Sequence, residues 1–291
     1  MTAPEQGLTI ALSSGLTIRM MSRATRTLVA LLLVAAAGAG ASCAHAAGAA
    51  VSPPRSFERQ IEINEHLLTL HLSPPAQLHR DELIVYATGD AGWRGKDREV
   101  YQQLRAWGYA TAGFSAPEYL KHLPGDDGTT TPARLASDFS TIVDAARTSL
   151  QVGLSSPVVL VGVSRGADLA VVAAGQQGLQ AELAGVVAMG LTREEEYVHH
   201  MREPMVALDL YQYLPQLGDV PLSVIQSTRD NYLPANDARV LFGQDTPLRV
   251  FHSIDARNHS FSGARPALYS TLRTSLAWVE RIGRRRGAPR P

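Results

Sequence analysis

The stretch GVSRG, residues 162–166, places a serine midway between two glycines. This is the G-x-S-x-G pattern of a nucleophile elbow, a sharp strand-to-helix turn that exposes a serine hydroxyl above a sheet. Side chains at Gly162 and Gly166 would collide with the neighbouring strand and helix, so the turn needs glycine there. The pattern predicts that Ser164 attacks a carbonyl carbon, and a chance match in a glycine-rich chain is the alternative.

The residues on either side of Ser164 favour the same turn. Residues 158–163 form a short apolar run rich in β-branched side chains, which is typical of a strand buried on both faces of a parallel sheet. Residues 167–174 are rich in Ala, Leu and Val and contain no proline, which favours a buried helix. The serine is therefore expected at the junction of a strand and a helix.

A serine hydroxyl becomes a strong nucleophile only when a base takes its proton, and a carboxylate usually orients that base. Asp230 follows the apolar segment PLSVIQST, and His259 follows the apolar segment LRVFHSI. Both residues thus stand in loops after predicted strands, in the order serine, acid, histidine that one class of catalytic triads uses. We predict a triad of Ser164, Asp230 and His259.

Other residues compete for two of these roles. Asp230 has the alternative of capping a helix that starts near Pro234, in which case Asp237 or Asp255 would be the acid. His252 is a second candidate base, but it lies inside an apolar strand-like segment and is expected to be a packed side chain.

An acyl transfer also needs two N–H groups aimed at the developing oxyanion. The residue after the nucleophile, Arg165, would supply one. The loop YATGDAGWRGKD after an early strand would supply the other from Asp90 or Ala91, because Gly89 and Gly92 free its backbone. An ordinary glycine-rich turn is the alternative.

Three large side chains near the end of that loop are candidate substrate-binding residues. Trp93 is a lid or core aromatic by default, whereas Arg94 and Lys96, together with Arg165, would bind an anionic group through charge-assisted hydrogen bonds. Solvated cations at the surface are the alternative reading of the same residues.

The composition bounds the partners. The 291 residues are 45% hydrophobic with 27 basic and 27 acidic side chains, which is typical of a globular protein and gives no sign of a nucleic-acid partner. Cys43 is the only cysteine, and no Cys/His group has zinc-site spacing. His199 and His200 are adjacent and would point in different directions. No metal and no cofactor are predicted.

The N-terminal region has the order of a secretory signal peptide. Arg23 and Arg26 precede an apolar core that is too short to span a membrane, and small residues follow it. We assign residues 1–46 to this signal, with translation expected to begin at Met20 or Met21 so that residues 1–19 lie upstream of the true start. The protein is therefore expected to be exported, to the periplasm or outside the cell.

Two processing routes are open. Cleavage after Ala46 fits the Ala44-His45-Ala46 site, and the mature protein would then contain no thiol. Lipidation of Cys43 is the alternative, although Gly40 is a poor match for the aliphatic residue that usually occupies that place.

The rest of the chain alternates predicted strands and helices. Residues 47–55 form a linker, and residues 56–283 form one α/β domain with a mostly parallel sheet flanked by helices on both faces. An edge hairpin is expected at 57–74, and residues 191–217 form a cap-like segment. The basic tail 284–291 is expected to be solvated, with peripheral contact to anionic lipid as the alternative.

Four motifs carry a family resemblance: TGDAGW at 88–93, GVSRGAD at 162–168, STRD at 227–230 and RNHSF at 257–261. Over most of residues 80–280 the chain resembles the secreted VirJ-type branch of the α/β-hydrolases. Relatives of that branch are similar in having a signal peptide, a GDGGW oxyanion loop and a GxSxGAD elbow. Ala91 replaces the middle glycine of the loop.

The resemblance implies an ester substrate. Some members of the branch hydrolyse the aminoacyl ester of lysyl-phosphatidylglycerol, so a phospholipid headgroup is an expected partner. The segment 191–217 departs from the family pattern, which leaves substrate identity open. Its run Glu194–Glu196 would attract a cationic aminoacyl group, or is simply a solvated face. The alternatives are a general carboxylesterase or lipase-like enzyme, and a non-catalytic binding protein on the same fold.

Overall fold

The structure is a computed structural model that describes residues 55–75, 82–123, 129–198 and 207–287. These residues belong to one compact unit, Pro53–Pro291. The predicted signal peptide and nearly all of the linker lie outside the described residues, as does the part of the cap-like segment at 199–206.

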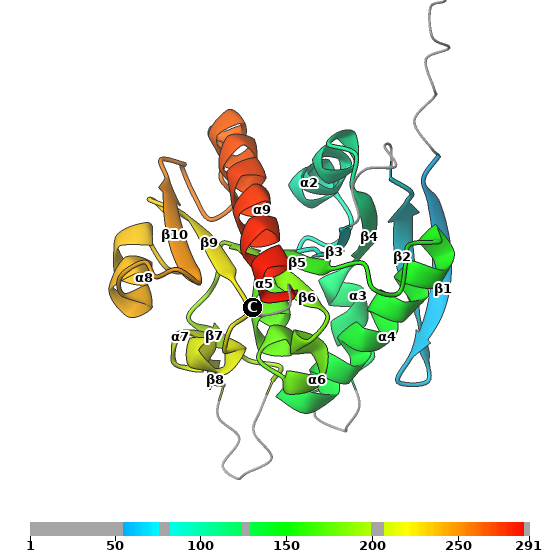
Figure 1. Ribbon diagram of the computed structural model, residues 1–291. Helices are drawn as coiled ribbons and strands as arrows, with labels where there is room; N and C mark the ends of the chain where they lie inside the picture. Colours follow the sequence, from blue (N-terminus) through cyan, green and yellow to red (C-terminus); the bar gives the residue numbers. More distant parts are fainter. Residues whose placement is uncertain (1–54, 76–81, 124–128, 199–206, 288–291) are drawn as a thin grey trace, which may run out of the picture. The chain divides into compact units, whose positions relative to one another are not determined.

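One eight-stranded sheet forms the centre of the unit, in the order β1-β2-β4-β3-β5-β6-β9-β10. The strands are β1 Phe57–Ile63, β2 His66–Ser73, β3 Leu83–Ala87, β4 Ala110–Phe114, β5 Val158–Val163, β6 Leu183–Met189, β9 Leu222–Ser227 and β10 Arg249–Ile254. All neighbours from β4 to β10 are parallel, whereas β1 pairs with β2 and β2 with β4 in antiparallel register. In Figure 1, β1 in blue and β10 in orange lie at opposite edges of the sheet.

The edge hairpin forms where the alternation of apolar and polar residues predicts it. Asn64 and Glu65 connect β1 to β2 with positive φ values of 52° and 65°, which suits a tight hairpin turn. Alternate residues of β2, such as Leu68 and Leu70, are fully buried against the core. Leu67, on the opposite face of the same strand, is 57% exposed. The hairpin extends the sheet and covers the edge of β4.

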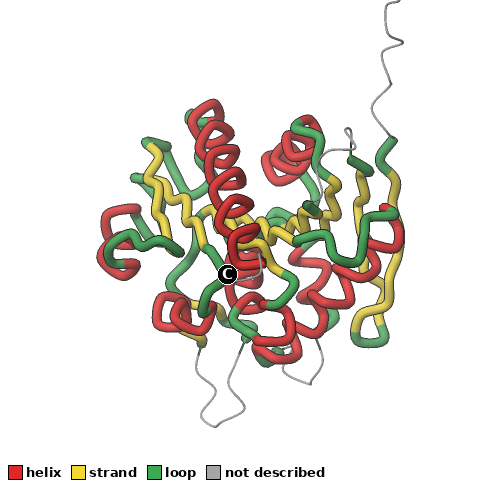
Figure 2. The backbone as a smooth tube through the Cα atoms, in the orientation of Figure 1, coloured by secondary structure: helices red, strands yellow, loops and turns green. Residues whose placement is uncertain are grey.

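Helices cover both faces of the sheet, as the alternating pattern predicts. They are α2 Gly95–Ala106, α3 Ala116–Leu120, α4 Pro132–Leu150, α5 Arg165–Ala174, α6 Gln177–Gln180, α7 Leu210–Tyr213, α8 Ala235–Phe242 and α9 Arg265–Gly287. One apolar cluster packs α4 and α5 on one face, and a second packs α2 and α9 on the other. Figure 1 and Figure 2 show α2 and α9 on the upper side of the sheet and α4 with α6 on the lower side.

The ends of the helices have local causes. Thr131 caps α4 by accepting a hydrogen bond from the Arg134 N–H at 3.3 Å, and Pro132 occupies the first turn, as its sequence predicts. Helix α9 continues beyond the predicted start of the tail at 284, to Gly287. Arg284 pairs with Glu82, and an Arg286 Nη1–H donates to the Leu183 carbonyl at 3.2 Å, so this last turn has contacts at the sheet while Arg284, Arg285 and Arg286 remain exposed.

The described parts of the cap-like segment form small elements. Strands β7 Glu194–Glu195 and β8 Leu208–Asp209 pair antiparallel, and α7 and the 3₁₀ helix η1 Leu214–Leu217 follow. Helix α7 packs near α5, which carries Arg165 at its start. Within the described ranges, no helix combines the length and the apolar character needed to cross a bilayer.

Candidate active site

The predicted site residues come together at one edge of the sheet. The chain leaves β3, β5, β9 and β10 at their carboxyl ends, and the next loops carry Asp90, Ser164, Asp230 and His259 respectively. Because these strands are parallel, their carboxyl ends meet at the same edge, which is where open α/β sheets bind ligands.

Ser164 lies at a strained turn between β5 and α5. Its φ of 52° and ψ of −125° are unusual for a residue other than glycine, and strain of this kind gathers at functional sites. A Cβ on Gly162 would lie 2.2 Å from the Gly166 carbonyl oxygen, and one on Gly166 would lie 2.3 Å from the Ala87 carbonyl oxygen. The two flanking glycines therefore have the steric role expected from the pattern.

His259 and Asp230 form a buried pair. The ring Nδ1 lies 2.6 Å from Oδ2 of Asp230, and the carboxylate is fully buried while the histidine is 8% exposed. Oδ1 accepts the backbone N–H groups of Tyr232 and Leu233 at 2.9 and 3.2 Å, and Gln226 donates to Oδ2 at 3.1 Å. Each carboxylate oxygen has partners, so the buried charge is held in one orientation.

The other ring nitrogen of His259 is available. Nε2 is buried and has no hydrogen-bond partner among the described residues. Gly190, with φ of +66°, makes room for the ring, because a Cβ there would lie 2.9 Å from Cε1. The Tyr232 ring packs edge-on against the imidazole with centroids 4.8 Å apart. The histidine can therefore take a proton at Nε2 while Nδ1 remains bonded to Asp230.

The competing residues have other surroundings. Asp230 is not the cap of α8, because Pro234 occupies that position and no side chain caps the helix. Asp237 is exposed in the first turn of α8, and the Asp255 side chain is 79% exposed. His252 is half-buried within β10, where burial lowers its pKa.

The glycine-rich loop after β3 lies against the serine. A Cβ on Gly89 would be 3.2 Å from Cβ of Ser164. The Gly92 N–H donates to the Gly89 carbonyl at 3.0 Å, which places Asp90 and Ala91 at the tip of a tight turn. The N–H groups of Asp90 and Ala91 have no acceptor among the described residues.

The second candidate donor is the first residue of α5. The N–H groups in the first turn of a helix have no intrahelical acceptor, so the Arg165 N–H is free to bind an anion. The buried Asp97 carboxylate supports the loop on the other side, because its Oδ1 accepts the Gly89 N–H at 3.2 Å. The geometry thus offers free N–H groups on two loops beside Ser164.

Comparison with known proteins agrees with this architecture. The family described as bacterial virulence protein (VirJ) matches residues 81–210. This stretch of the chain is similar to the VirJ family. The match includes the glycine-rich loop, the turn at Ser164 and the start of the cap-like segment, and it ends before Asp230 and His259. A search of curated proteins found no match.

Solved structures show that the chain has the α/β-hydrolase fold. Est1E from Butyrivibrio proteoclasticus is 14% identical with a TM-score of 0.57, over 76% of this chain and 98% of its own. A dienelactone hydrolase from Anabaena variabilis is 20% identical with a TM-score of 0.54, over 77% and 98% of the two chains. An alpha-beta serine hydrolase homologue from Coxiella burnetii is 14% identical with a TM-score of 0.56, over 76% and 97%.

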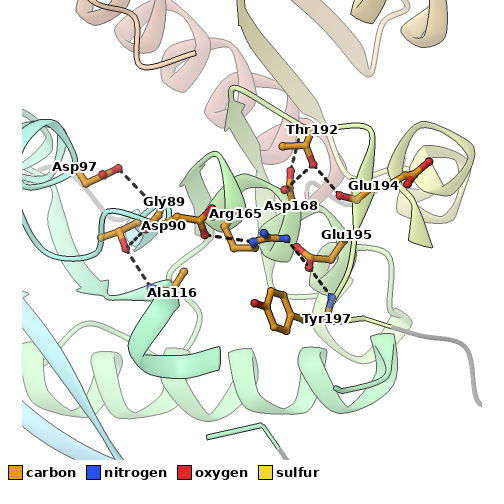
Figure 3. Close-up of polar contacts among 11 residues, drawn as sticks. Gly89, Asp90, Asp97, Ala116, Arg165, Asp168, Thr192, Glu194, Glu195 and Tyr197 are labelled. Carbon is orange, nitrogen blue, oxygen red and sulfur yellow. Dashed lines mark hydrogen bonds and ion pairs between the residues drawn. The ribbon is translucent and has the colours of Figure 1, made fainter. Parts of the chain in front are cut away.

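The Arg165 side chain lies in a network that the sequence did not indicate. Nε lies 3.3 Å from Oδ1 of Asp90, and Nη1 lies 3.1 Å from Oε1 of Glu195 (Figure 3). The guanidinium also lies over the Tyr197 ring, 5.0 Å from its centroid. Glu195 is the middle residue of the acidic run and is fully buried, whereas a charge run normally indicates a solvated face.

A second buried acid lies beside this network. Asp168, from the GAD of the elbow motif, accepts hydrogen bonds from the Thr192 N–H at 3.0 Å and from its hydroxyl at 2.8 Å (Figure 3). Burial raises the pKa of Asp168 well above its usual range, and the nearby Glu195 raises it further. Burial also raises the pKa of Glu195, although Arg165 opposes that shift.

The three predicted substrate-binding side chains, Trp93, Arg94 and Lys96, do not lie together. Trp93 stacks flat on His71 with centroids 3.8 Å apart, so it packs over the edge hairpin. Arg94 is exposed and its Nε–H donates to the Ala91 carbonyl at 2.6 Å, which braces the loop.

Lys96 alone of the three lines a cavity next to the histidine loop. That cavity of about 460 Å³ also includes Phe261 and Arg265, close after His259 in the chain. Burial lowers the pKa of Lys96. Among the described residues, no group of three or more His, Cys, Asp or Glu side chains is arranged to hold a metal ion.

Proposed function

We propose that this chain is an exported serine hydrolase that cleaves a carboxylic ester through Ser164, His259 and Asp230. The observation that carries the proposal is the buried His259–Asp230 pair, with Nδ1 and Oδ2 2.6 Å apart and Nε2 without a hydrogen-bond partner in the described part of the chain. A base held in this way, at the same sheet edge as a strained serine turn, is the arrangement that acyl transfer needs.

The roles follow from the geometry. As the Ser164 hydroxyl oxygen attacks the ester carbonyl, His259 accepts its proton at Nε2. Asp230 holds Nδ1–H and stabilises the imidazolium that forms. The oxyanion binds the N–H of Arg165 and that of Asp90 or Ala91.

The tetrahedral intermediate then collapses. The C–O bond to the leaving alcohol breaks, and His259 gives its proton to that alcohol. A water molecule attacks the acyl-serine with His259 again as base, which releases the acid and restores Ser164.

The VirJ resemblance supplies the first substrate to test, the aminoacyl ester of an aminoacyl-phosphatidylglycerol. Hydrolysis there would release an amino acid and leave phosphatidylglycerol. The signal peptide predicted from the sequence supports the same proposal, since such lipids are membrane components. Export itself predicts that the mature chain begins at Ala47, or at a lipidated Cys43, which mass spectrometry of the N-terminal peptide would distinguish.

The test compares purified wild type and Ser164→Ala on vesicles containing lysyl-phosphatidylglycerol and on short p-nitrophenyl esters. We expect the wild type to release lysine and the variant to lose at least about a thousandfold in turnover, since triad members act as a unit. Turnover of short esters alone would instead support a general carboxylesterase. Absence of turnover on both, with folded protein, would support a binding protein on this fold.

A further inference from the structure

Two of the residues proposed for the oxyanion hole, Arg165 and Asp90, are bonded to each other through their side chains. Asp90 belongs to the loop after β3, and Arg165 to the turn after β5, 75 positions apart in the chain. Oδ1 of Asp90 accepts a hydrogen bond from Nε of Arg165 at 3.3 Å, and the contact is also an ion pair. The side-chain contact thus joins Arg165, which carries one backbone donor, to the loop tip that carries the other at Asp90 or Ala91.

The guanidinium is fixed from a second direction. Glu195 has no exposed side-chain area, and its Oε1 accepts both Nη1–H of Arg165 at 3.1 Å and the Tyr197 N–H at 2.9 Å. The Tyr197 ring lies under the guanidinium carbon. The Arg165 side chain is only 16% exposed as a result. Figure 3 shows it extended between Asp90 on one side and Glu195 on the other.

We propose that Arg165 is a positioning residue whose side chain fixes the spacing between the two halves of the oxyanion hole. This inference rests on the proposed function. Its physical reason is that oxyanion donors act only within a narrow range of distance, and a shift of about 1 Å can cost about a hundredfold in rate. Without the bridge, the loop tip at Asp90 is held by its own turn, by the contact at Gly89 and by the Arg94 side chain on the Ala91 carbonyl, none of which reaches the turn that carries Arg165.

The planar guanidinium suits this role. It donates in two directions at fixed angles, so Asp90 and Glu195 are bound by one rigid group. The bonds to a charged carboxylate in a half-buried site are stronger than neutral ones. Because Glu195 lies in β7, the same group also connects the oxyanion loop to the cap-like segment.

The test measures kcat and KM separately for Arg165→Met and Asp90→Ala on a p-nitrophenyl ester that the wild type hydrolyses. Both changes keep the backbone N–H groups. We expect kcat to fall about tenfold to a hundredfold in Arg165→Met and less in Asp90→Ala, with KM within about twofold, since the oxyanion forms only in the transition state. In the double variant the loss should not exceed that of Arg165→Met, because both changes break one bridge.

A matched control separates positioning from stability. Arg147 is a buried arginine paired with Glu182, and its side chain is 6% exposed. Glu182 directly precedes β6, so this pair lies at the amino ends of the parallel strands, away from the site. Arg147→Met should lose stability but keep kcat. Asp90 is itself exposed, so Asp90→Ala still decides the question if Arg165→Met does not fold.

The outcomes distinguish the two proposals. An active wild type whose kcat is unchanged in Asp90→Ala and Arg165→Met overturns the positioning role and leaves the proposed function standing. Losses in the two single variants that multiply in the double variant also overturn it. A folded wild type with no turnover and no reaction with an active-site phosphonate overturns the proposed function, and this inference with it.

Discussion

The imidazole of His259 occupies the space that Gly190 leaves by having no Cβ. A Cβ at this position would lie 2.9 Å from Cε1 of the ring, closer than van der Waals contact allows. Gly190 directly follows β6, the strand between that of Ser164 and that of Asp230, so its lack of a side chain lets the histidine lie between them. The backbone of the central strands thus shapes the site as directly as the polar side chains do.

We predict that Gly190→Ala lowers kcat by about tenfold to a hundredfold, because the displaced ring no longer holds its productive geometry. The positive φ strains an alanine here, which lowers the free energy of unfolding by about 1 kcal/mol. Gly243→Ala is the matched control, since Gly243 also has positive φ but nothing within 4 Å of its missing Cβ. In steady-state kinetics, kcat should be lower for Gly190→Ala than for Gly243→Ala. Equal kcat values would contradict the role given to Gly190.

Asp230→Asn should reduce turnover by about a thousandfold to ten-thousandfold while leaving the fold intact. The amide keeps an oxygen for the Tyr232 and Leu233 N–H groups, but it presents an N–H to the Nδ1 side of the ring. The ring proton of His259 then lies on Nε2 instead of Nδ1, so Nε2 cannot accept the serine proton. Turnover and the thermal midpoint, measured together, test this separation.

Asp255→Asn serves as the control for that result. Asp255 carries the same charge and was a competing candidate acid, but its side chain is 79% exposed and pairs with Arg229 at 2.9 Å. We expect its turnover to match that of the wild type. If instead Asp255→Asn were inactive and Asp230→Asn active, the acid would be misassigned.

Asp168 should make stability depend on pH. Burial raises its pKa in the folded protein above that of the unfolded chain, so at pH values above about 4 the folded state binds more protons than the unfolded state. The free energy of unfolding therefore falls with rising pH, by up to about 1.4 kcal/mol per pH unit for one proton. We predict that Asp168→Asn reduces this slope and unfolds at higher urea concentration than the wild type at pH 8.

Urea unfolding between pH 4 and pH 8 measures the difference in slope between wild type and variant. Asp144→Asn, a change at a carboxylate that is 72% exposed on α4, should leave the slope as it is. If Asp168→Asn and the wild type had parallel profiles, Asp168 would be ionised throughout, contrary to its surroundings.

Local sequence patterns predict most of the fold. Period-two alternation predicts the β1–β2 hairpin, and continuous apolar runs predict β5, β6 and β9, because these strands are buried on both faces. Short elements such as α3 and α6 escape prediction, since one or two turns have too few residues for a helical period. The end of α9 was missed because Arg284 gains a partner, Glu82, that is distant in sequence.

The residues of the candidate site also divide into those that the sequence indicates and those that it does not. Ser164, Asp230 and His259 are found at one sheet edge because each follows a strand, which a sequence can indicate. Glu195 reads as one of three solvated acids, and only the pairing of β7 with β8 turns it inward to Arg165. Gly190 carries no polar group, so its role appears only when the ring of His259 is placed against it.

The most direct test of the central claim is mass spectrometry of the protein after reaction with a fluorophosphonate, which forms a stable ester only with an activated serine. Our account predicts one adduct on the peptide that contains Ser164, no adduct in Ser164→Ala, and a rate at least about a hundredfold lower in His259→Ala because the base is lost. An adduct on a different serine, or a folded wild type that does not react, would contradict it.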